Sequence, residues 1–277
     1  MIEIRQDKCL RCGKCIRECV IKILKSGNDG VPFLPEELKE SCLNCQHCLA
    51  ACPSGALICN GVSAEQCEPI RPLPRPEDML SLLRQRRSIR KYKNESVSPE
   101  ILEQLKASLA WSPTGCNAHS LMFRVVETKE EMNFYRMETN RMIMKFVKSG
   151  IMRWVYPAIN RFLESIQNGE DVIYRGAPHM IVAAVPKKAP CAEADPWIAL
   201  SYFDLLLQSY GLGSCWCGFA VHAFKWNKTL QKQLAFPKGY KIAAVLLFGK
   251  PDTEYFRATA PENFKILTGE SPENPPD

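Results

Sequence analysis

The sequence CLRCGKCIREC at residues 9–19 is matched in pattern by CLNCQHCLAACP at residues 42–53. In each copy three cysteines stand three positions apart, and a fourth follows the third after three other residues. Three thiolates at this spacing can surround one face of a cubic iron–sulfur cluster, and the fourth cysteine of such a run ligates the other cluster of a two-cluster module. The spacing therefore predicts two [4Fe-4S] clusters. The predicted ligands are Cys9, Cys12, Cys15 and Cys52 for one cluster, and Cys42, Cys45, Cys48 and Cys19 for the other.

Structural zinc sites and a disulfide framework are the two alternatives for a stretch so rich in cysteine. Zinc sites also use Cys-x-x-Cys, but they rarely place three cysteines in tandem at this spacing. Disulfides are disfavoured because cluster ligands are thiolates and the N-terminal MIEIR begins no apolar signal region. The stretch resembles the bacterial two-cluster ferredoxins, although Val20 stands where those proteins usually have proline. The long span from Cys19 to Cys42 predicts an extra hairpin or loop, and Cys59 and Cys67 are interpreted as ordinary thiols.

The whole chain has the length and composition of a two-domain globular protein. Its 277 residues are 46% apolar and 24% charged, and its longest apolar runs are too short to cross a bilayer. Since no signal region is visible, we expect a cytoplasmic protein, in which fourteen cysteines indicate metal or redox chemistry. Residues 1–68 carry 8 Lys and Arg against 9 Asp and Glu, whereas residues 69–277 carry 28 against 21. This basic excess suits an anionic cofactor or an acidic partner; no recognition motif for nucleic acid accompanies it.

A proline-rich segment divides the chain. The sequence EPIRPLPRP at residues 68–76 contains four prolines, which exclude a helix interior or a central strand. It is predicted to be an extended, semi-rigid linker. The predicted organisation is an iron–sulfur domain at residues 1–68, a linker at 69–76 and a larger domain at 77–277.

Helical and strand-like patterns alternate in the larger domain. Periodicity and start signals predict helices from Glu77, from Ser98 to Leu109, and at residues 129–168, 195–210 and 224–236. Apolar runs predict strands at residues 121–126, 178–185 and 241–249. The fold class is thus predicted to be α+β, with a small ferredoxin-like domain followed by helices packed on a small sheet. The helix at 195–210 is apolar nearly all round and is expected to be buried.

The segment 129–168 is rich in methionine and aromatic residues. Such a stripe most often belongs to a core or a dimer interface, and a plastic substrate pocket is the alternative. Its members are Met132, Phe134, Met137, Met142, Met144, Phe146, Met152 and Trp154.

Four short motifs in the larger domain indicate an anionic ligand. RRSIR at residues 86–90 places three guanidinium groups and a hydroxyl at a helix end, where arginine forks match phosphate oxygens. Alone, this motif is more typical of a solvated basic face. SPTGCNAH at 112–119 is a polar turn before an apolar strand, GLGSCWCG at 211–218 follows the buried helix, and Arg257 comes after GKP at 249–251.

In order and spacing these motifs resemble the nitroreductase family of FMN-dependent oxidoreductases, over roughly residues 77–270. The resemblance implies three groups of flavin-binding residues and an obligate homodimer with FMN at its interface. The phosphate and ribityl chain would be bound by Arg86, Arg87, Ser88 and Arg90, with Arg257 returning to the phosphate. The loop residues that reach the flavin from the partner subunit would be Pro113, Thr114 and Asn117. The residues that line the isoalloxazine would be Cys215, Trp216, Cys217 and Gly218.

The chain departs from the family pattern beside the loop asparagine. The family often has Gln-Pro-Trp there, whereas residues 119–121 are His-Ser-Leu. His119 would either donate a hydrogen bond to flavin or substrate, or be an ordinary packed or solvated histidine. A redox role is the less favoured interpretation of three thiols near the motifs, Cys116, Cys215 and Cys217. No role follows for Cys191, and no catalytic acid or base is indicated.

Clusters and flavin together make a redox circuit. Iron–sulfur clusters pass single electrons, and flavin stores two and delivers a hydride. We therefore predict an oxidoreductase that feeds electrons through the clusters to FMN, which reduces a small acceptor such as a nitroaromatic or a quinone. The alternatives are another reaction of the superfamily, such as dehalogenation or enone reduction, and a non-catalytic electron carrier docked on a larger redox complex. The donor would be a ferredoxin-type protein or NAD(P)H, although no Gly-x-Gly-x-x-Gly follows a predicted strand.

Overall fold

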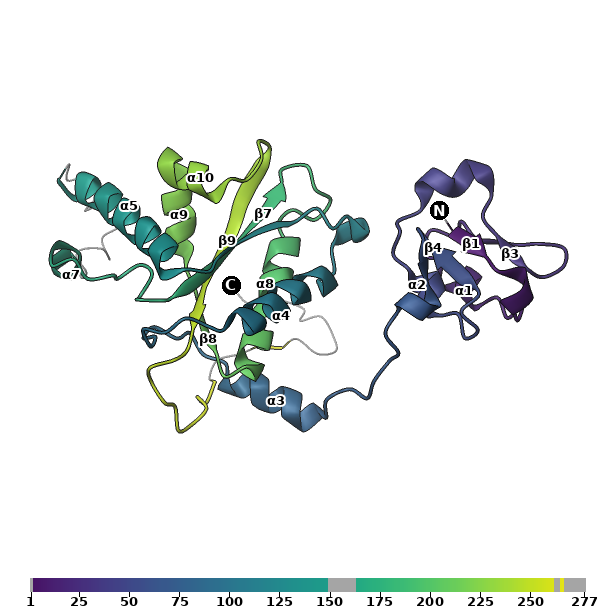
Figure 1. Ribbon diagram of the computed structural model, residues 1–277, viewed down its shortest axis with the longest axis horizontal. Coiled ribbons are helices and arrows are strands. Elements are labelled where there is room, and N and C mark those ends of the chain that lie inside the picture. Colours follow the sequence, from purple (N-terminus) through teal and green to yellow (C-terminus); the bar gives the residue numbers. More distant parts are fainter. Residues whose placement is uncertain (1, 149–162, 262–264, 267–277) are drawn as a thin grey trace, which may run out of the picture.

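The computed structural model describes residues 2–148, 163–261 and 265–266. Two folded parts are joined by an extended segment (Figure 1). Residues 68–75 of that segment are exposed and contain neither helix nor strand. The predicted α+β fold class is confirmed, with a small sheet in each part.

The N-terminal part is built on a three-stranded antiparallel sheet. Its strand order is β1 (Ile2–Ile4), β4 (Leu57–Cys59) and β5 (Val62–Ser63). Two short helices, α1 (Lys14–Glu18) and α2 (His47–Ala50), pack against each other, and each carries the third cysteine of one repeat. The expected insertion between the repeats is a hairpin of β2 (Lys25–Ser26) and β3 (Pro32–Phe33), followed by a 3-10 helix at Glu36–Ser41.

The larger part contains a four-stranded antiparallel sheet. Its order is β6 (Met122–Val126), β7 (His179–Pro186), β9 (Tyr240–Gly249) and β8 (Gly213–Trp216). The three predicted strands are confirmed to within about one residue at each end. The fourth, β8, was missed because its glycine-rich sequence looks like a turn, yet all four of its residues pair with β9.

Within the described residues, seven α-helices of the larger part pack around the sheet or against one another. They are α3 (Pro76–Gln85), α4 (Pro99–Ser108), α5 (Lys129–Lys148), α7 (Leu163–Gln167), α8 (Asp195–Ser209), α9 (Gly218–Trp226) and α10 (Lys228–Leu234). The single helix predicted at 224–236 is wrong, because Asn227 ends α9 and caps α10 by accepting hydrogen bonds from the Thr229 and Leu230 amides. In residues 2–148 and 163–261 no helix is both long and apolar enough to span a membrane.

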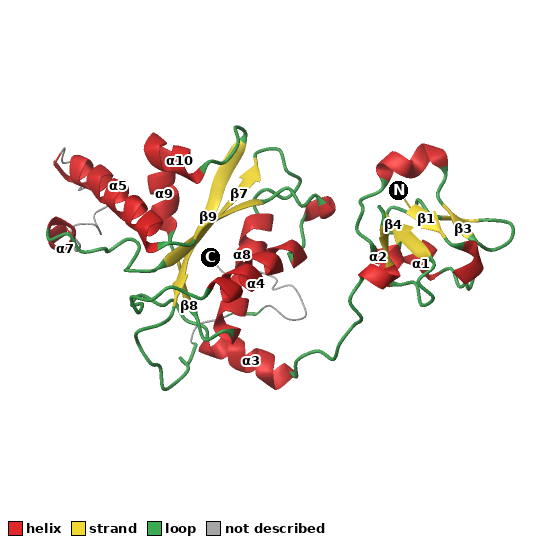
Figure 2. Cartoon of the chain, viewed as in Figure 1, coloured by secondary structure: helices red, strands yellow, loops and turns green. Residues whose placement is uncertain are grey.

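The central strands are buried on both faces (Figures 1 and 2). On β7, Met180 and Val182 face the core formed with α5, α9 and α10, whereas Ile181 and Ala183 face the core formed with α4 and α8. Because successive side chains face opposite cores, and both cores are apolar, the sequences of the two central strands, β7 and β9, are continuous apolar runs. The methionine-rich helix α5 places Met132 in the core, but Met137 is 62% exposed. The predicted Met152 and Trp154 lie outside the described residues.

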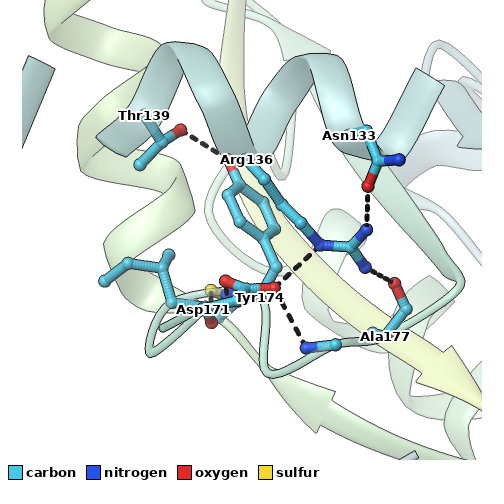
Figure 3. A network of polar contacts seen from close by, with 9 residues as sticks. Asn133, Arg136, Thr139, Asp171, Tyr174 and Ala177 are labelled. Atoms are coloured by element: carbon cyan, nitrogen blue, oxygen red, sulfur yellow. Dashed lines mark hydrogen bonds and ion pairs between the residues drawn. The ribbon is translucent and has the colours of Figure 1, made fainter. Parts of the chain in front are cut away.

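A polar network fastens α5 to the segment before β7 (Figure 3). Arg136 Nε lies 2.8 Å from Asp171 Oδ2, and its guanidinium also donates to the Ala177 carbonyl. Thr139 Oγ1 and the Tyr174 hydroxyl are 2.9 Å apart within the core. These contacts hold the segment whose Ile173 carbonyl accepts a hydrogen bond from the Cys217 thiol, behind one of the predicted flavin-binding stretches.

One face of α8 departs from expectation. The helix was predicted to be buried all round, but Trp197, Ile198 and Tyr202 are 48%, 37% and 52% exposed. The opposite face, with Leu200, Phe203 and similar side chains, is fully packed in the core. The single chain therefore leaves an uncovered apolar stripe along a helix whose other face is packed in the core.

Candidate cofactor sites

Each of the two predicted cluster sites is a cavity in the N-terminal part. One cavity is lined by Cys9, Cys12, Cys15 and Cys52, and the other by Cys19, Cys42, Cys45 and Cys48. The fold thus brings the fourth cysteine of each repeat to the first three of the other. All fourteen cysteines are free thiols. In the described part of the chain no group of three or more His, Cys, Asp or Glu side chains is arranged to hold a single metal ion.

The two cavities are enclosed by the same backbone curl. Arg11 and Asn44 hold the equivalent position in the two repeats and have φ of 52° and 54°. The next equivalent pair, Gly13 and Gln46, has φ of 66° and 58°. Left-handed residues placed between right-handed and extended ones turn successive N–H groups inward, which favours a negatively charged group. The Arg11 amide accordingly donates to Cys9 Sγ at 3.4 Å.

The thiols differ in how readily they ionise. Burial opposes ionisation of Cys52, but hydrogen bonds from the Ala56 amide, 3.3 Å from the sulfur, and from Ser54 outweigh it, so its pKa is lowered. Burial raises the pKa of Cys48 to about 12. Iron binding displaces thiol protons, so both residues suit ligation in the loaded protein. The eight cysteines therefore fit two clusters in residue type, grouping and backbone surroundings.

A basic cavity of about 530 Å³ lies between α3 and the C-terminal segment. It is lined by Arg84, Arg87 and Arg257, together with Ser81 and Gln85. In the described residues none of these three guanidinium groups pairs with a carboxylate, unlike six other arginines of the chain. The cavity has the size and charge to take the phosphate end of a nucleotide.

Arg87 lines this cavity and also contacts the C-terminal segment. Its Nη1 and Nη2 lie 3.3 Å from Thr259 Oγ1 and 3.2 Å from the Arg257 carbonyl, across more than 165 sequence positions. Its guanidinium also stacks 5.7 Å from the Tyr255 ring centroid. Two predicted phosphate-binding residues, Arg87 and Arg257, are thus brought together. Arg84 was not among the predicted site residues, although it lines the same cavity.

The rest of the RRSIR motif lies along β8. Ser88 pairs with Ser214 in a parallel bridge, and the Ile89 amide donates to the Ser214 carbonyl at 2.7 Å. Arg86 points to Asp204 of α8, with 3.6 Å between Nη1 and Oδ2, rather than into the cavity. Arg90 donates to the Ser88 carbonyl at 3.4 Å. The motif therefore splits into one cavity-lining arginine and residues that attach the segment to the sheet.

The stretch Cys215–Gly218 continues from this attachment. A Cβ at Gly213 would lie 2.2 Å from Ile89 Cγ1, so only glycine lets the two segments approach so closely. Trp216 is stacked on Trp197 of α8, with 5.1 Å between centroids. Cys215 and Cys217 are buried, and burial raises the pKa of Cys217 to about 12. The inert-thiol interpretation of Cys217 fits this environment better than the redox one.

The loop Ser112–His119 lies at the other end of α8. Its Gly115 amide donates to buried Asp195 Oδ1 at 3.0 Å, Pro113 is exposed, and Thr114 Oγ1 accepts from the His119 amide. Cys116, Asn117 and His119 all have left-handed φ, between 41° and 53°. Such conformations are strained for these residues and mark segments that the surroundings hold in place.

The Asn117 carboxamide joins the two parts of the protein. Its Nδ2 donates to the Leu43 carbonyl at 3.0 Å, and its Oδ1 lies 2.9 Å from His119 Nε2. Leu43 stands between the predicted ligands Cys42 and Cys45. His119 is thus an exposed histidine that holds Asn117, and Asn117 contacts the cysteine-rich part of its own chain.

Two buried aspartates of α8 organise the predicted flavin-binding residues. Asp195 holds the loop, and Asp204, 4% exposed, accepts from Ser214 and pairs with Arg86. The two aspartates are nine positions apart in the helix, about 14 Å along its axis. Within one chain the loop and the Arg87 cavity are therefore not brought together. Sequence analysis missed both residues, although two carboxylates in an otherwise apolar helix were a visible signal.

Two family models match the chain. The model described as the nitroreductase family matches residues 83–250, and one described as a 4Fe-4S dicluster domain matches residues 8–57. The resemblance noted from the motifs is thereby confirmed for both regions. The second match spans all eight predicted cluster ligands.

Individual relatives and solved structures add to this. A nitroreductase with bound FMN from Desulfitobacterium hafniense DCB-2 is 27% identical and superposes with a TM-score of 0.57, over 70% of this chain and 98% of that one. An iodotyrosine deiodinase from Thermotoga neapolitana is 24% identical over 178 residues, 63% of this chain and 89% of that protein. An archaeal NADPH glutamate synthase from Archaeoglobus fulgidus is 38% identical over 58 residues, 21% of this chain and only 11% of that enzyme.

Proposed function

The chain belongs to the nitroreductase family and carries a 4Fe-4S dicluster domain, and from this premise we propose an iron–sulfur flavoprotein that reduces a small acceptor. Two [4Fe-4S] clusters would pass electrons singly to one FMN per chain. The observation that carries the proposal is the presence, in one chain, of two cavities that each gather four predicted cysteine ligands and of a third cavity lined by three arginines.

Different residues would bind the phosphate and the ring of FMN. Arg84, Arg87 and Arg257 offer guanidinium donors to the phosphate, and the stretch Cys215–Gly218 lies next to the segment that carries Arg87. When bound, FMN supplies a ring that accepts electrons and delivers a hydride. Buried Asp204 accepts a hydrogen bond from Ser214 of β8 and pairs with Arg86, and so holds the RRSIR segment next to β8. The chain's own contribution is orientation and positive charge.

The electron route would run through the contact of Leu43 with Asn117. That contact places the cavity of Cys42, Cys45, Cys48 and Cys19 beside the loop that, by family resemblance, reaches the flavin of a partner subunit. The cluster in this cavity would therefore be the one that reduces the flavin. The cluster of Cys9, Cys12, Cys15 and Cys52 would receive electrons from an external one-electron donor, such as a reduced ferredoxin.

The proposed acceptor is a nitroaromatic or a quinone. A second candidate is reductive dehalogenation, and one observation favours it: the similarity to the iodotyrosine deiodinase of Thermotoga neapolitana over 178 residues. A solved iodotyrosine deiodinase, bound to FMN and 3-iodo-L-tyrosine, also shares the fold, with a TM-score of 0.50 and 22% identity. Parallel turnover of a nitroaromatic, a quinone and an iodotyrosine by the reduced protein would rank these acceptors.

We propose a homodimer whose interface includes the exposed stripe of α8. Trp197, Ile198 and Tyr202 form an apolar surface on a helix otherwise packed in the core, beside Trp216. A second copy would cover it and bring the partner's loop to the flavin. In analytical ultracentrifugation Tyr202→Glu should shift the protein toward monomer, whereas Met137→Glu, at an exposed position of α5, should not. An unchanged dimer in the first variant would contradict this interface.

The decisive experiment is anaerobic purification followed by iron, sulfide and flavin assays. The proposal expects iron and sulfide for two clusters and one FMN per chain. Stopped-flow mixing with reduced ferredoxin should then bleach the flavin, and Cys12→Ser should slow that step while leaving FMN bound. A protein that contains zinc in place of iron, or that binds no flavin, would overturn the proposal. Rapid bleaching by NADPH with no response to ferredoxin would overturn the proposed donor.

A further inference from the structure

A fifth thiol lies at one of the two cysteine cavities. The cavity of Cys19, Cys42, Cys45 and Cys48 is also lined by Cys59. The residues lining the other cavity include Cys9, Cys12, Cys15 and Cys52 and, in the described part of the chain, no additional cysteine. The repeated cysteine pattern accounts for eight thiols and leaves this one without a role.

Cys59 is held firmly in this position. It ends strand β4, where it pairs with Ile2 on one side and Val62 on the other, and it is only 1% exposed. Its side chain lines the same cavity as Cys42, Cys45 and Cys48. A cysteine that is not a metal ligand is a thiol, and its S–H is a hydrogen-bond donor.

We propose that Cys59 is not a ligand, but donates its S–H to the sulfur atoms of the cluster held by Cys42, Cys45, Cys48 and Cys19, and thereby raises that cluster's reduction potential. Reduction adds one negative charge to a cluster, and a hydrogen bond to its sulfurs stabilises the added charge. The inference rests on the proposed presence of both clusters. It makes the two clusters unequal through a residue that lies outside the ligand pattern.

The role also suits the proposed electron route. The cavity that holds Cys59 is the one next to the Leu43 contact with Asn117. A hydrogen-bond donor that makes this cluster easier to reduce would favour electron flow toward it from the other cluster. The transfer would be of a single electron, lost by one cluster and gained by the other, with no bond made or broken.

The test is an anaerobic redox titration of the complete protein, followed by the EPR signals of its reduced clusters. Cys59→Ala removes the donor, and Cys59→Ser replaces the thiol with a hydroxyl donor of smaller size. Cys67→Ala is the matched control, since Cys67 is exposed and donates to the Ser63 carbonyl instead. The expected result is that one of two midpoint potentials becomes more negative in Cys59→Ala, while the other stays within the difference between Cys67→Ala and the wild type. Cys59→Ser should lie closer to the wild type than Cys59→Ala does.

Two results would overturn the inference. Unchanged potentials in Cys59→Ala, with full iron content, would mean that the thiol does not bond to the cluster. Loss of one cluster's iron in both Cys59 variants, with FMN retained, would mean that Cys59 is a ligand. If the wild type itself contains no iron, it is the proposed function that fails, and the iron assay separates that case from the other two.

Discussion

The iron–sulfur part and the larger part build their candidate sites in opposite ways. Residues 9–52 supply all eight predicted cluster ligands, by repeating one backbone curl twice. The arginine cavity instead joins Arg87 to residues 170 and 172 positions later in the chain. The first kind of site is encoded in local spacing, whereas the second exists only after the sheet and α8 have formed.

This difference determines how each part should respond to damage. Loss of one predicted cysteine ligand should affect one cavity and leave the larger part folded. None of these eight cysteines belongs to the two hydrophobic cores of the larger part. Changes in the larger part should spread, because α8 holds β8, the RRSIR segment and the Ser112–His119 loop at once. The following variants test this contrast, from the largest expected effect to the smallest.

The largest effect is expected from Arg87→Ala. The variant removes one of the three guanidinium groups that line the cavity, and charge-assisted hydrogen bonds contribute about 1.5–3 kcal/mol. FMN affinity should therefore fall by up to about 100-fold. Titration of the apoprotein with FMN, followed by quenching of flavin fluorescence, measures the change.

Arg75→Ala is the matched control. Arg75 lies just before α3, is exposed and pairs with Asp78, so FMN should bind this variant as it binds the wild type. Iron and sulfide content should stay at wild-type values in both variants if the two parts are independent. If Arg87→Ala binds FMN with wild-type affinity, the phosphate does not bind in this cavity.

The same contrast explains what could be predicted from the sequence. The cysteine grouping, the extra hairpin and three strands follow from spacing and apolar runs, which are local properties. Strand β8 was missed because its pairing with β9 compensates for a glycine-rich sequence, and the exposed stripe of α8 was missed because composition does not tell which face a helix buries. The contacts of Asp195 and Asp204 were also missed, since their partners are distant in sequence.

A smaller effect is expected from Asp204→Asn. The amide still accepts from Ser214, but the partly buried Arg86 loses its counter-charge. Breaking such a pair from one side leaves an uncompensated charge, which should lower the free energy of unfolding by about 2 kcal/mol. Urea unfolding followed by tryptophan fluorescence measures this, because all five tryptophans follow residue 110 and lie in the larger part.

Asp78→Asn is the control for that measurement. It breaks an exposed pair with Arg75 on α3, and exposed pairs contribute little to stability. We therefore expect wild-type unfolding for this variant. If Asp204→Asn is equally unaffected, α8 does not organise the site in the way the contrast requires.

The smallest effect concerns pH and His179, which has no counterpart in the iron–sulfur part, where the single histidine, His47, is exposed. His179 is fully buried, accepts from the Val97 amide at 2.9 Å, and contacts the Val126 carbonyl, and burial lowers its pKa. In the unfolded chain a histidine has a pKa of about 6.5. As the pH falls below that value the unfolded state binds a proton that the folded state does not, so stability is full above about pH 6.5 and declines toward the folded pKa, by at most about 1.4 kcal/mol per pH unit.

Urea unfolding at pH 7.5, 6.5 and 5.5, followed by tryptophan fluorescence, should therefore show a steeper loss of stability for the wild type than for His179→Gln, whose amide cannot titrate. A wild-type slope in His179→Gln would show that this histidine does not make the larger part acid-sensitive.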